Sequence, residues 1–212
     1  MTPAYTPLGH YDWNRVAHDL DAEGWALLPG FFAQAAAHPL LQPSCEAGAR
    51  RTLEALGRDL YPRLLPLARA WETALQSDAR YPDDFSAWLD CNRAAGQTRP
   101  LSAVHRHRPG DGQALMQHAD GEHIFALQLV ALLSAPGTDF TGGEFVMTEQ
   151  RPRMQSRPMV LPLQQGDAAV IAVSHRPVQG AHNVYRVTAR QAISRVRSGE
   201  RVGLEVVLHN GR

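Results

Sequence analysis

The spacing of hydrophobic residues divides the chain near residue 100. Before it, apolar residues recur every three or four positions, which is typical of amphipathic helices. This pattern predicts helices over residues 12–22, 31–41, 46–76 and 83–94, and a short strand at residues 25–28. Pro62 and Pro66 interrupt the longest of these segments. Because an internal proline removes a helical hydrogen bond, we expect a break or kink near Tyr61.

After Pro100 the chain changes to short apolar runs separated by Gly-Asp, Pro-Gly, Gly-Gly and Ser-Gly turns. These runs predict strands. They cover residues 101–104, 114–116, 124–133, 144–148, 159–163, 168–173, 184–187, 191–196 and 202–208. Short strands after a helical first half indicate helices packed on a β-sandwich or barrel. We therefore expect a single domain over residues 1–212, with a mainly helical layer at 1–100 and a β core at 101–212.

Composition narrows the function class. The 212 residues carry 21 basic and 21 acidic side chains, so the formal charge is zero and nothing draws the chain electrostatically to nucleic acid or to an anionic membrane. No apolar stretch approaches the ~20 residues that span a bilayer, and residues 1–11 do not have the pattern of a signal peptide. We expect a cytoplasmic protein, with Cys45 and Cys91 as free thiols.

The first candidate for chemistry is the pair His118 and Asp120, which has one residue between its members. On a strand, side chains two apart share a face, so such a pair can point two metal ligands at one site. The alternative is two polar residues at a strand end beside a turn.

Longer strings resemble a known family. They are residues 136–157 (PGTDFTGGEFVMTEQRPRMQSR), Gly166-Asp167 leading into HRPVQG at 175–180, and SRVRSG at 194–199. The chain from Tyr61 to His209 resembles bacterial iron(II)/2-oxoglutarate-dependent oxygenases. That resemblance implies a double-stranded β-helix, or jelly-roll, core packed against N-terminal helices.

The resemblance also implies a site. In that family a His-x-Asp pair and a distal His hold Fe(II) as a facial triad, which leaves positions for 2-oxoglutarate and dioxygen. An arginine about ten residues after the distal His binds the far carboxylate of 2-oxoglutarate. Carried over to this sequence, these roles fall on His118, Asp120, Gln191 and Arg201. Gln191 is a degenerate ligand, and Gly203 stands where the family commonly has a hydroxyl residue.

The alignment of the first pair has an alternative. Matching Gly121 onward without a gap puts Met116 and His118 at the two ligand positions, whereas a two-residue shift puts His118 and Asp120 there. Met116 with His118 would suit a softer metal such as copper. His175 or His182 could replace the distal histidine.

A basic cluster follows the Gly-Gly turn. Arg153, Arg157 and Arg176, together with Arg151, could bind an anionic substrate or a partner carboxylate, and Glu144 could be the buried acid that pairs with one of them. The alternative is a set of solvated loop charges.

Two functions of different class follow. The first is an oxygenase that uses Fe(II) and 2-oxoglutarate to oxidise a small or macromolecular substrate. The second is a non-catalytic homologue, or pseudoenzyme, that binds a ligand or a protein partner after loss of the distal histidine, alone or as a homo- or hetero-oligomer. A cupin-type metal isomerase that uses His105, His107 and His118 is a more distant alternative.

Overall fold

The computed structural model describes residues 5–33, 46–151, 155–180 and 183–212. The N-terminal part forms a 3-10 turn, η1 (Leu8–His10), and the helices α1 (Trp13–Glu23), α3 (Glu46–Ala74) and α4 (Phe85–Ala94). Asp12 and Asp84 cap α1 and α4, each accepting two backbone N–H bonds. Within the described part of the chain, no helix is long and apolar enough to cross a membrane.

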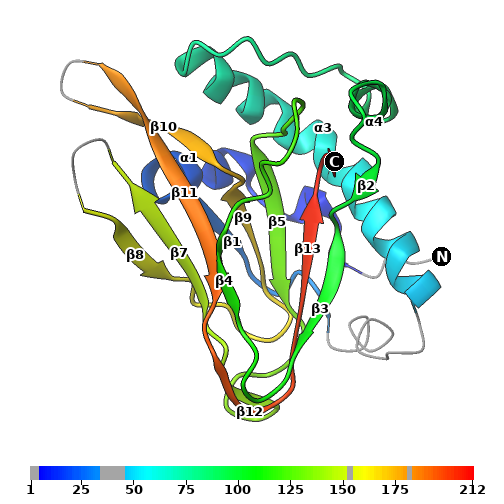
Figure 1. The fold of residues 1–212 in the computed structure, drawn as a ribbon, viewed down its shortest axis with the longest axis vertical. Coiled ribbons are helices and arrows are strands. Elements are labelled where there is room, and N and C mark those ends of the chain that lie inside the picture. The colour runs from blue at the N-terminus through cyan, green and yellow to red at the C-terminus, as the bar shows by residue number, and fades with distance from the viewer. Residues whose placement is uncertain (1–4, 34–45, 152–154, 181–182) are drawn as a thin grey trace.

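Two antiparallel sheets make up the β core (Figure 1). The first has the order β1-β9-β5-β13-β3, and the second has the order β10-β11-β7-β8, with β4 also paired to β11. Their bounds are β1 Trp25–Leu28, β3 Ala103–His107, β4 Gln113–Met116, β5 Leu127–Leu132, β7 Phe145–Gln150, β8 Arg157–Val160, β9 Ala168–Ala172, β10 His175–Gln179, β11 Val184–Ile193 and β13 Arg201–Val207. Two small pairs join β12 (Val196–Gly199) to β6 (Phe140–Gly142) and β14 (Asn210–Gly211) to β2 (Arg99–Pro100).

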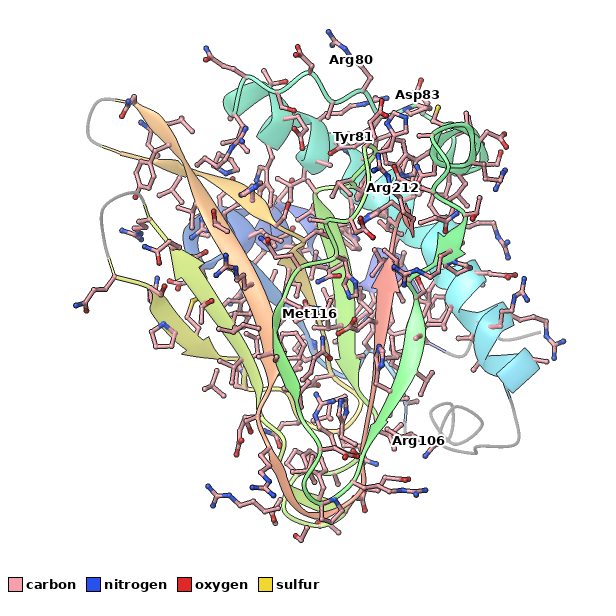
Figure 2. The ribbon with its side chains drawn as sticks, viewed as in Figure 1. Arg80, Tyr81, Asp83, Arg106, Met116 and Arg212 are labelled. Atoms are coloured by element: carbon pink, nitrogen blue, oxygen red, sulfur yellow. The ribbon has the colours of Figure 1, made fainter. Side chains whose placement is uncertain are left out.

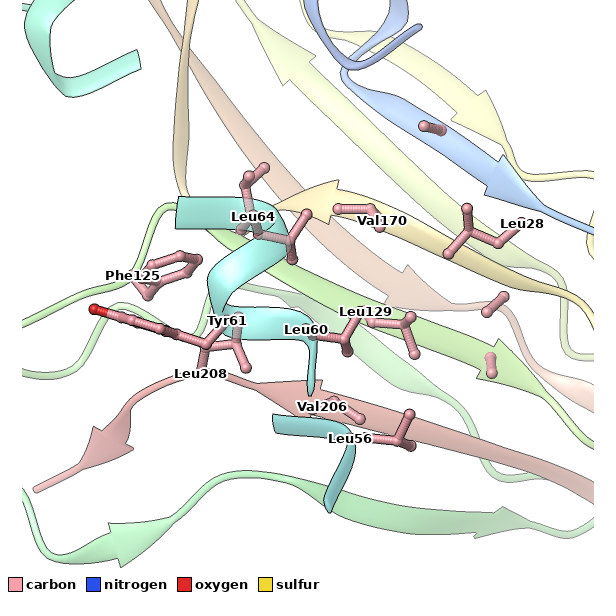
Figure 3. Close-up of a cluster of buried hydrophobic side chains, with 14 of the residues drawn as sticks. Leu28, Leu56, Leu60, Tyr61, Leu64, Phe125, Leu129, Val170, Val206 and Leu208 are labelled. Atoms are coloured by element: carbon pink, nitrogen blue, oxygen red, sulfur yellow. The ribbon is translucent and has the colours of Figure 1, made fainter. Parts of the chain in front are cut away.

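Alternation along the central strands separates two hydrophobic cores. In β5, Leu129 packs toward the helices and Val130 toward the second sheet. The core outside the barrel joins α3 to the first sheet, where Leu56, Leu60 and Leu64 face the strand residues shown in Figure 3. Because β5, β9 and β13 are covered on both faces, they read as nearly continuous apolar runs in the sequence.

The fold class expected from the resemblance is confirmed: this is a double-stranded β-helix with helices packed on it. Several element boundaries differ. The two strands predicted at 184–187 and 191–196 form one strand, β11, and the strands β6, β10 and β12 were not predicted. These three strands are short or contain proline or glycine, so they carry little periodic signal.

The predicted break near Tyr61 is wrong, because α3 continues through Pro62 and Pro66. Tyr61 is fully buried, and its hydroxyl donates to the Pro82 carbonyl at 2.7 Å. We infer that burial of the leucine-rich face outweighs the backbone hydrogen bonds that the two prolines omit. The helix predicted at 31–41 is absent over residues 31–33, where Phe31 and Phe32 are buried outside a helix; residues 34–45 lie outside the described part of the chain.

Gly24 ends α1 with a φ of +81°, and a Cβ there would lie 2.4 Å from Glu149 Oε1 and 2.7 Å from Arg176 Nε. Gly24→Ala is expected to lower the free energy of unfolding by roughly 2 kcal/mol, from the left-handed backbone and the clash together. Gly30 has a φ of +60° with nothing within 4 Å of its Cβ position, so Gly30→Ala should show the smaller backbone cost of about 1 kcal/mol. Equal losses in urea unfolding would contradict a role for the clash.

Candidate functional site

The barrel interior carries polar side chains among apolar ones. On β13, Arg201, Gly203 and Glu205 alternate with Val202, Leu204 and Val206, which belong to the helix-facing core. Gln128 of β5 and Gln191 of β11 are also buried and meet inside the barrel. A buried polar group is costly unless it is hydrogen-bonded, so their partners define the site.

These residues form one connected network centred on Glu205. His118 Nε2 lies 2.7 Å from Glu205 Oε2, and Gln191 Nε2 donates to Glu205 Oε1 at 3.2 Å. Gln128 Nε2 in turn donates to Gln191 Oε1. His105 Nε2 lies 3.7 Å from Glu205 Oε2. The carboxylate is therefore shared by side chains from three separate segments.

The charge state of Glu205 follows from these contacts. Burial raises the pKa of the carboxyl group, but the hydrogen bonds and positive charge of His105 and His118 outweigh burial and bring the pKa to about 2. Glu205 is consequently an anion at neutral pH, although its side chain is only 6% exposed.

His118 lies in a segment that its surroundings fix. The His118 carbonyl is 2.8 Å from Nε2 of the buried His209. One residue earlier, Gln117 Nε2 donates to the carbonyls of Ser174 and Ala189. Downstream, the buried Gln97 accepts the backbone N–H groups of Glu122 and His123 and so holds the turn at Gly121.

The strand argument for His118 and Asp120 does not hold. β4 ends at Met116, so both residues lie beyond the strand, and Asp120 is exposed whereas His118 points into the network. In the β4–β11 pairing Met116 stands opposite Gln191 (Figure 2 labels Met116). This register agrees with the ungapped alignment, which assigns the two first ligand positions to Met116 and His118.

Arg201 is buried at the opposite end of the same face of β13, and its Nε donates to the Gly143 carbonyl at 2.8 Å. Burial lowers the pKa of the guanidinium to about 10. A Cβ on Gly203 would lie 2.7 Å from Arg201 Nη1, so the glycine leaves room for the arginine to fold back over the strand. A cavity of about 10 Å³ lies between Arg201, Glu205 and the histidines of β3. It has room for about one water molecule.

The other predicted site residues lie elsewhere. His175 on β10 is 3.5 Å from the Thr188 hydroxyl and does not join the network. Arg157 pairs at the surface with Glu23 at 3.0 Å. Arg176 is fully buried against Glu149, which corrects the expectation that it faces a substrate. Glu144 is exposed and bonds Ser194, so Glu149 and not Glu144 is the buried acid. Arg153 and His182 lie outside the described residues.

The residues present do not fit the family's iron and 2-oxoglutarate. Met116 offers a thioether, Asp120 is exposed, and both Gln191 and His118 are already bonded to Glu205. Among the described residues no three His, Cys, Asp or Glu side chains are arranged as ligands of one ion. The cavity beside Arg201 is also far too small for a five-carbon dicarboxylate.

Sequence reasoning missed Glu205 and Gln128. Both interrupt apolar runs, VGLEVV and LQLVAL, that read as strands buried on both faces. A charged residue within such a run is rarely buried without a partner. That was the available signal, although it does not identify the partner.

Jelly-roll sheets of this order and a buried arginine early in the last long strand define a double-stranded β-helix protein of the 2-oxoglutarate/iron oxygenase superfamily. A family model, Oxygenase-NA, matches residues 46–211 and is described as "Oxygenase, catalysing oxidative methylation of damaged DNA". Since this match covers most of the chain, the protein belongs to that family.

Relatives and solved structures agree with this assignment. A protein of Mycobacterium tuberculosis, described as uncharacterized in two strains, is 42% identical over 160 residues, which are 76% of this chain and 69% of the relative. A prolyl 4-hydroxylase of Phytophthora capsici superposes with a TM-score of 0.52 at 14% identity, over 92% of this chain and 64% of the other. The non-heme alpha-ketoglutarate-dependent epimerase SnoN gives 0.50 and 14%, over 91% and 80%. The two structures support the fold alone.

Proposed function

We propose that this protein does not carry out the standard iron(II)/2-oxoglutarate reaction and that it acts as a binding or partner protein on the oxygenase fold. The observation that carries this proposal is the Glu205 carboxylate, which His118 and Gln191 hydrogen-bond inside the barrel. The two side chains at ligand positions that could reach an ion are thereby engaged with an internal anion.

The chemistry of the donor set supports the same proposal. A facial triad of two imidazoles and one carboxylate suits ferrous iron and leaves three open positions. Met116, His118 and Gln191 would offer a thioether, an imidazole and a neutral amide, which form a weaker set without a negative charge. Glu205 supplies that charge from a different strand.

The second candidate is an active oxygenase that oxidises a substrate with Fe(II) and 2-oxoglutarate. It is favoured by family membership and by Arg201, which is buried in the barrel ten residues after Gln191 and borders the cavity. Arg201 would then hold the far carboxylate of 2-oxoglutarate, as the guanidinium fork allows. The present cavity would have to open for that ligand.

The partner proposed for this protein is a small molecule or another protein. The family description names damaged DNA. Strong binding to DNA relies on lysine and arginine contacts with phosphates, and the formal charge of this chain is zero. We therefore do not carry nucleic acid over from the family to this chain.

An anaerobic titration with Fe(II) and 2-oxoglutarate tests the proposed function. We expect no visible metal-to-ligand charge-transfer band and no dioxygen-dependent decarboxylation of 2-oxoglutarate above a protein-free blank. An oxygenase with an intact triad serves as the positive control. A charge-transfer band with near-stoichiometric iron, or turnover of 2-oxoglutarate that disappears in Arg201→Met, would overturn the proposal and favour the second candidate.

A further inference from the structure

We propose that His105, His118 and Glu205 form a binding site for a divalent transition-metal ion, with a ligand set different from the one that the family implies. Two imidazoles and one carboxylate are ligands that first-row metals such as Zn²⁺ and Co²⁺ take in proteins. The inference does not depend on the proposed function, because it concerns other residues than the family's ligand positions.

The three groups converge from three parts of the chain. His105 lies on β3, Glu205 lies on the neighbouring strand β13, and His118 lies in the loop after β4. His118 Nε2 is 2.7 Å and His105 Nε2 is 3.7 Å from the same carboxylate oxygen, Glu205 Oε2. Metal–nitrogen and metal–oxygen bonds of about 2.1 Å would place these atoms about 3.0 to 3.4 Å apart. Each separation therefore needs to change by less than about 1 Å.

An unpartnered atom supports the proposal independently. His105 Nε2 is buried and has no hydrogen-bond partner among the described residues. Such orphan atoms are rare in folded proteins and need an explanation. A metal ion between His105 Nε2 and Glu205 Oε2 would supply the missing partner, and the buried anion would offset the positive charge of the ion.

Loading the site requires a local exchange. As the side chains stand, His118 bonds Glu205 directly, and the described residues contain no three-ligand group already placed about an ion. Binding replaces the hydrogen bond between His118 and Glu205 with two bonds to the metal, and any proton on His118 Nε2 passes to solvent. His105 gives a route of entry, because its side chain is 37% exposed.

Titration of the chelator-stripped protein with Co²⁺, followed by visible absorption, tests the site, and calorimetry with Zn²⁺ gives the affinity. We expect one ion per chain. His105→Asn and Glu205→Gln should weaken binding by at least about 100-fold, the upper end of the loss seen for residues that only support a ligand. Asp120→Asn and Met116→Leu are the matched controls and should change the affinity by less than about 3-fold.

Each other outcome is decisive. If the folded wild-type protein binds no Co²⁺ or Zn²⁺, or if His105→Asn binds as well as wild type, the proposal is wrong. It is also wrong if Asp120→Asn abolishes binding, since the ion would then use the family's pair. His105→Asn removes a side chain whose Nε2 has no hydrogen bond, so this variant should fold and keep the test valid even if Glu205→Gln does not. Circular dichroism and thermal unfolding check each variant.

Discussion

Replacing Glu149 with glutamine is expected to lower the free energy of unfolding by about 3 to 5 kcal/mol, because it leaves a buried arginine without its counter-charge. Arg176 and Glu149 are both fully buried. Arg176 Nη2 donates to Glu149 Oε2 at 3.0 Å, and Nε donates to the other carboxylate oxygen. Arg176 Nη1 also donates to the Asp21 carbonyl at 2.8 Å, so the pair fastens α1 to the second sheet.

The chain offers a matched control for this measurement. Arg157 and Glu23 form a second Arg–carboxylate pair between the second sheet and α1, at the same 3.0 Å, but both side chains are about half exposed. Glu23→Gln should therefore cost less than about 1 kcal/mol.

A double variant separates the loss of the pair from the penalty of an unpaired charge. Glu149→Leu combined with Arg176→Met should recover most of the stability that Glu149→Gln loses, since no buried charge remains. Urea unfolding measures all three variants. A loss below about 1 kcal/mol for Glu149→Gln would contradict the role assigned to the pair.

The fold could be predicted from the sequence because its strongest signals are local. The runs that became β5, β9 and β13 are apolar at nearly every position, and only strands covered on both faces tolerate that pattern. The long strings that resemble the family then named the jelly roll. The extent of α3 was harder to predict, because Pro62 and Pro66 argue locally for a break that the buried leucine face overrides.

The site could be predicted only in part, because its contacts join distant positions. His118 and Glu205 are 87 residues apart, and Gln128 and Gln191 are 63 apart. Spacing within a segment carries no information about such pairs. The pair of His118 and Asp120 failed for the same reason: its two-residue spacing implies a shared face only on a strand, and the strand ends at Met116. The pairing of Met116 with Gln191 decides the register that the sequence left open.

Acid destabilisation centred on His209 is the second large effect that we expect. The His209 side chain is buried, its Nδ1 accepts the Phe125 N–H at 3.3 Å, and its Nε2 is 2.8 Å from the His118 carbonyl. This arrangement needs the neutral ring with the proton on Nε2, because a proton on Nδ1 would oppose the Phe125 N–H. Burial accordingly lowers the pKa of His209 to about 4.

The sign of the pH dependence follows from that shift. Between the ordinary pKa of about 6.5 and the folded value, the unfolded chain binds a proton that the folded chain does not. The contribution of His209 to stability is therefore complete above pH 6.5 and is lost as the pH falls toward 4, by roughly 3 kcal/mol in all. Glu205 adds its own loss only at lower pH, below the ordinary pKa of a glutamate, since its folded pKa is about 2.

Urea unfolding at pH 7.5 and pH 4.5, in buffer with a chelator, measures the effect. His209→Asn keeps a polar side chain but cannot take up a proton in this range, so its loss of stability between the two pH values should be smaller than that of wild type by about 2 to 3 kcal/mol. His10→Asn, at an exposed position, should leave the wild-type difference unchanged. An equal loss in wild type and His209→Asn would mean that other groups cause the acid sensitivity. A reduced loss would identify His209 as the residue that ties the loop carrying His118 to the last strand in a pH-dependent way.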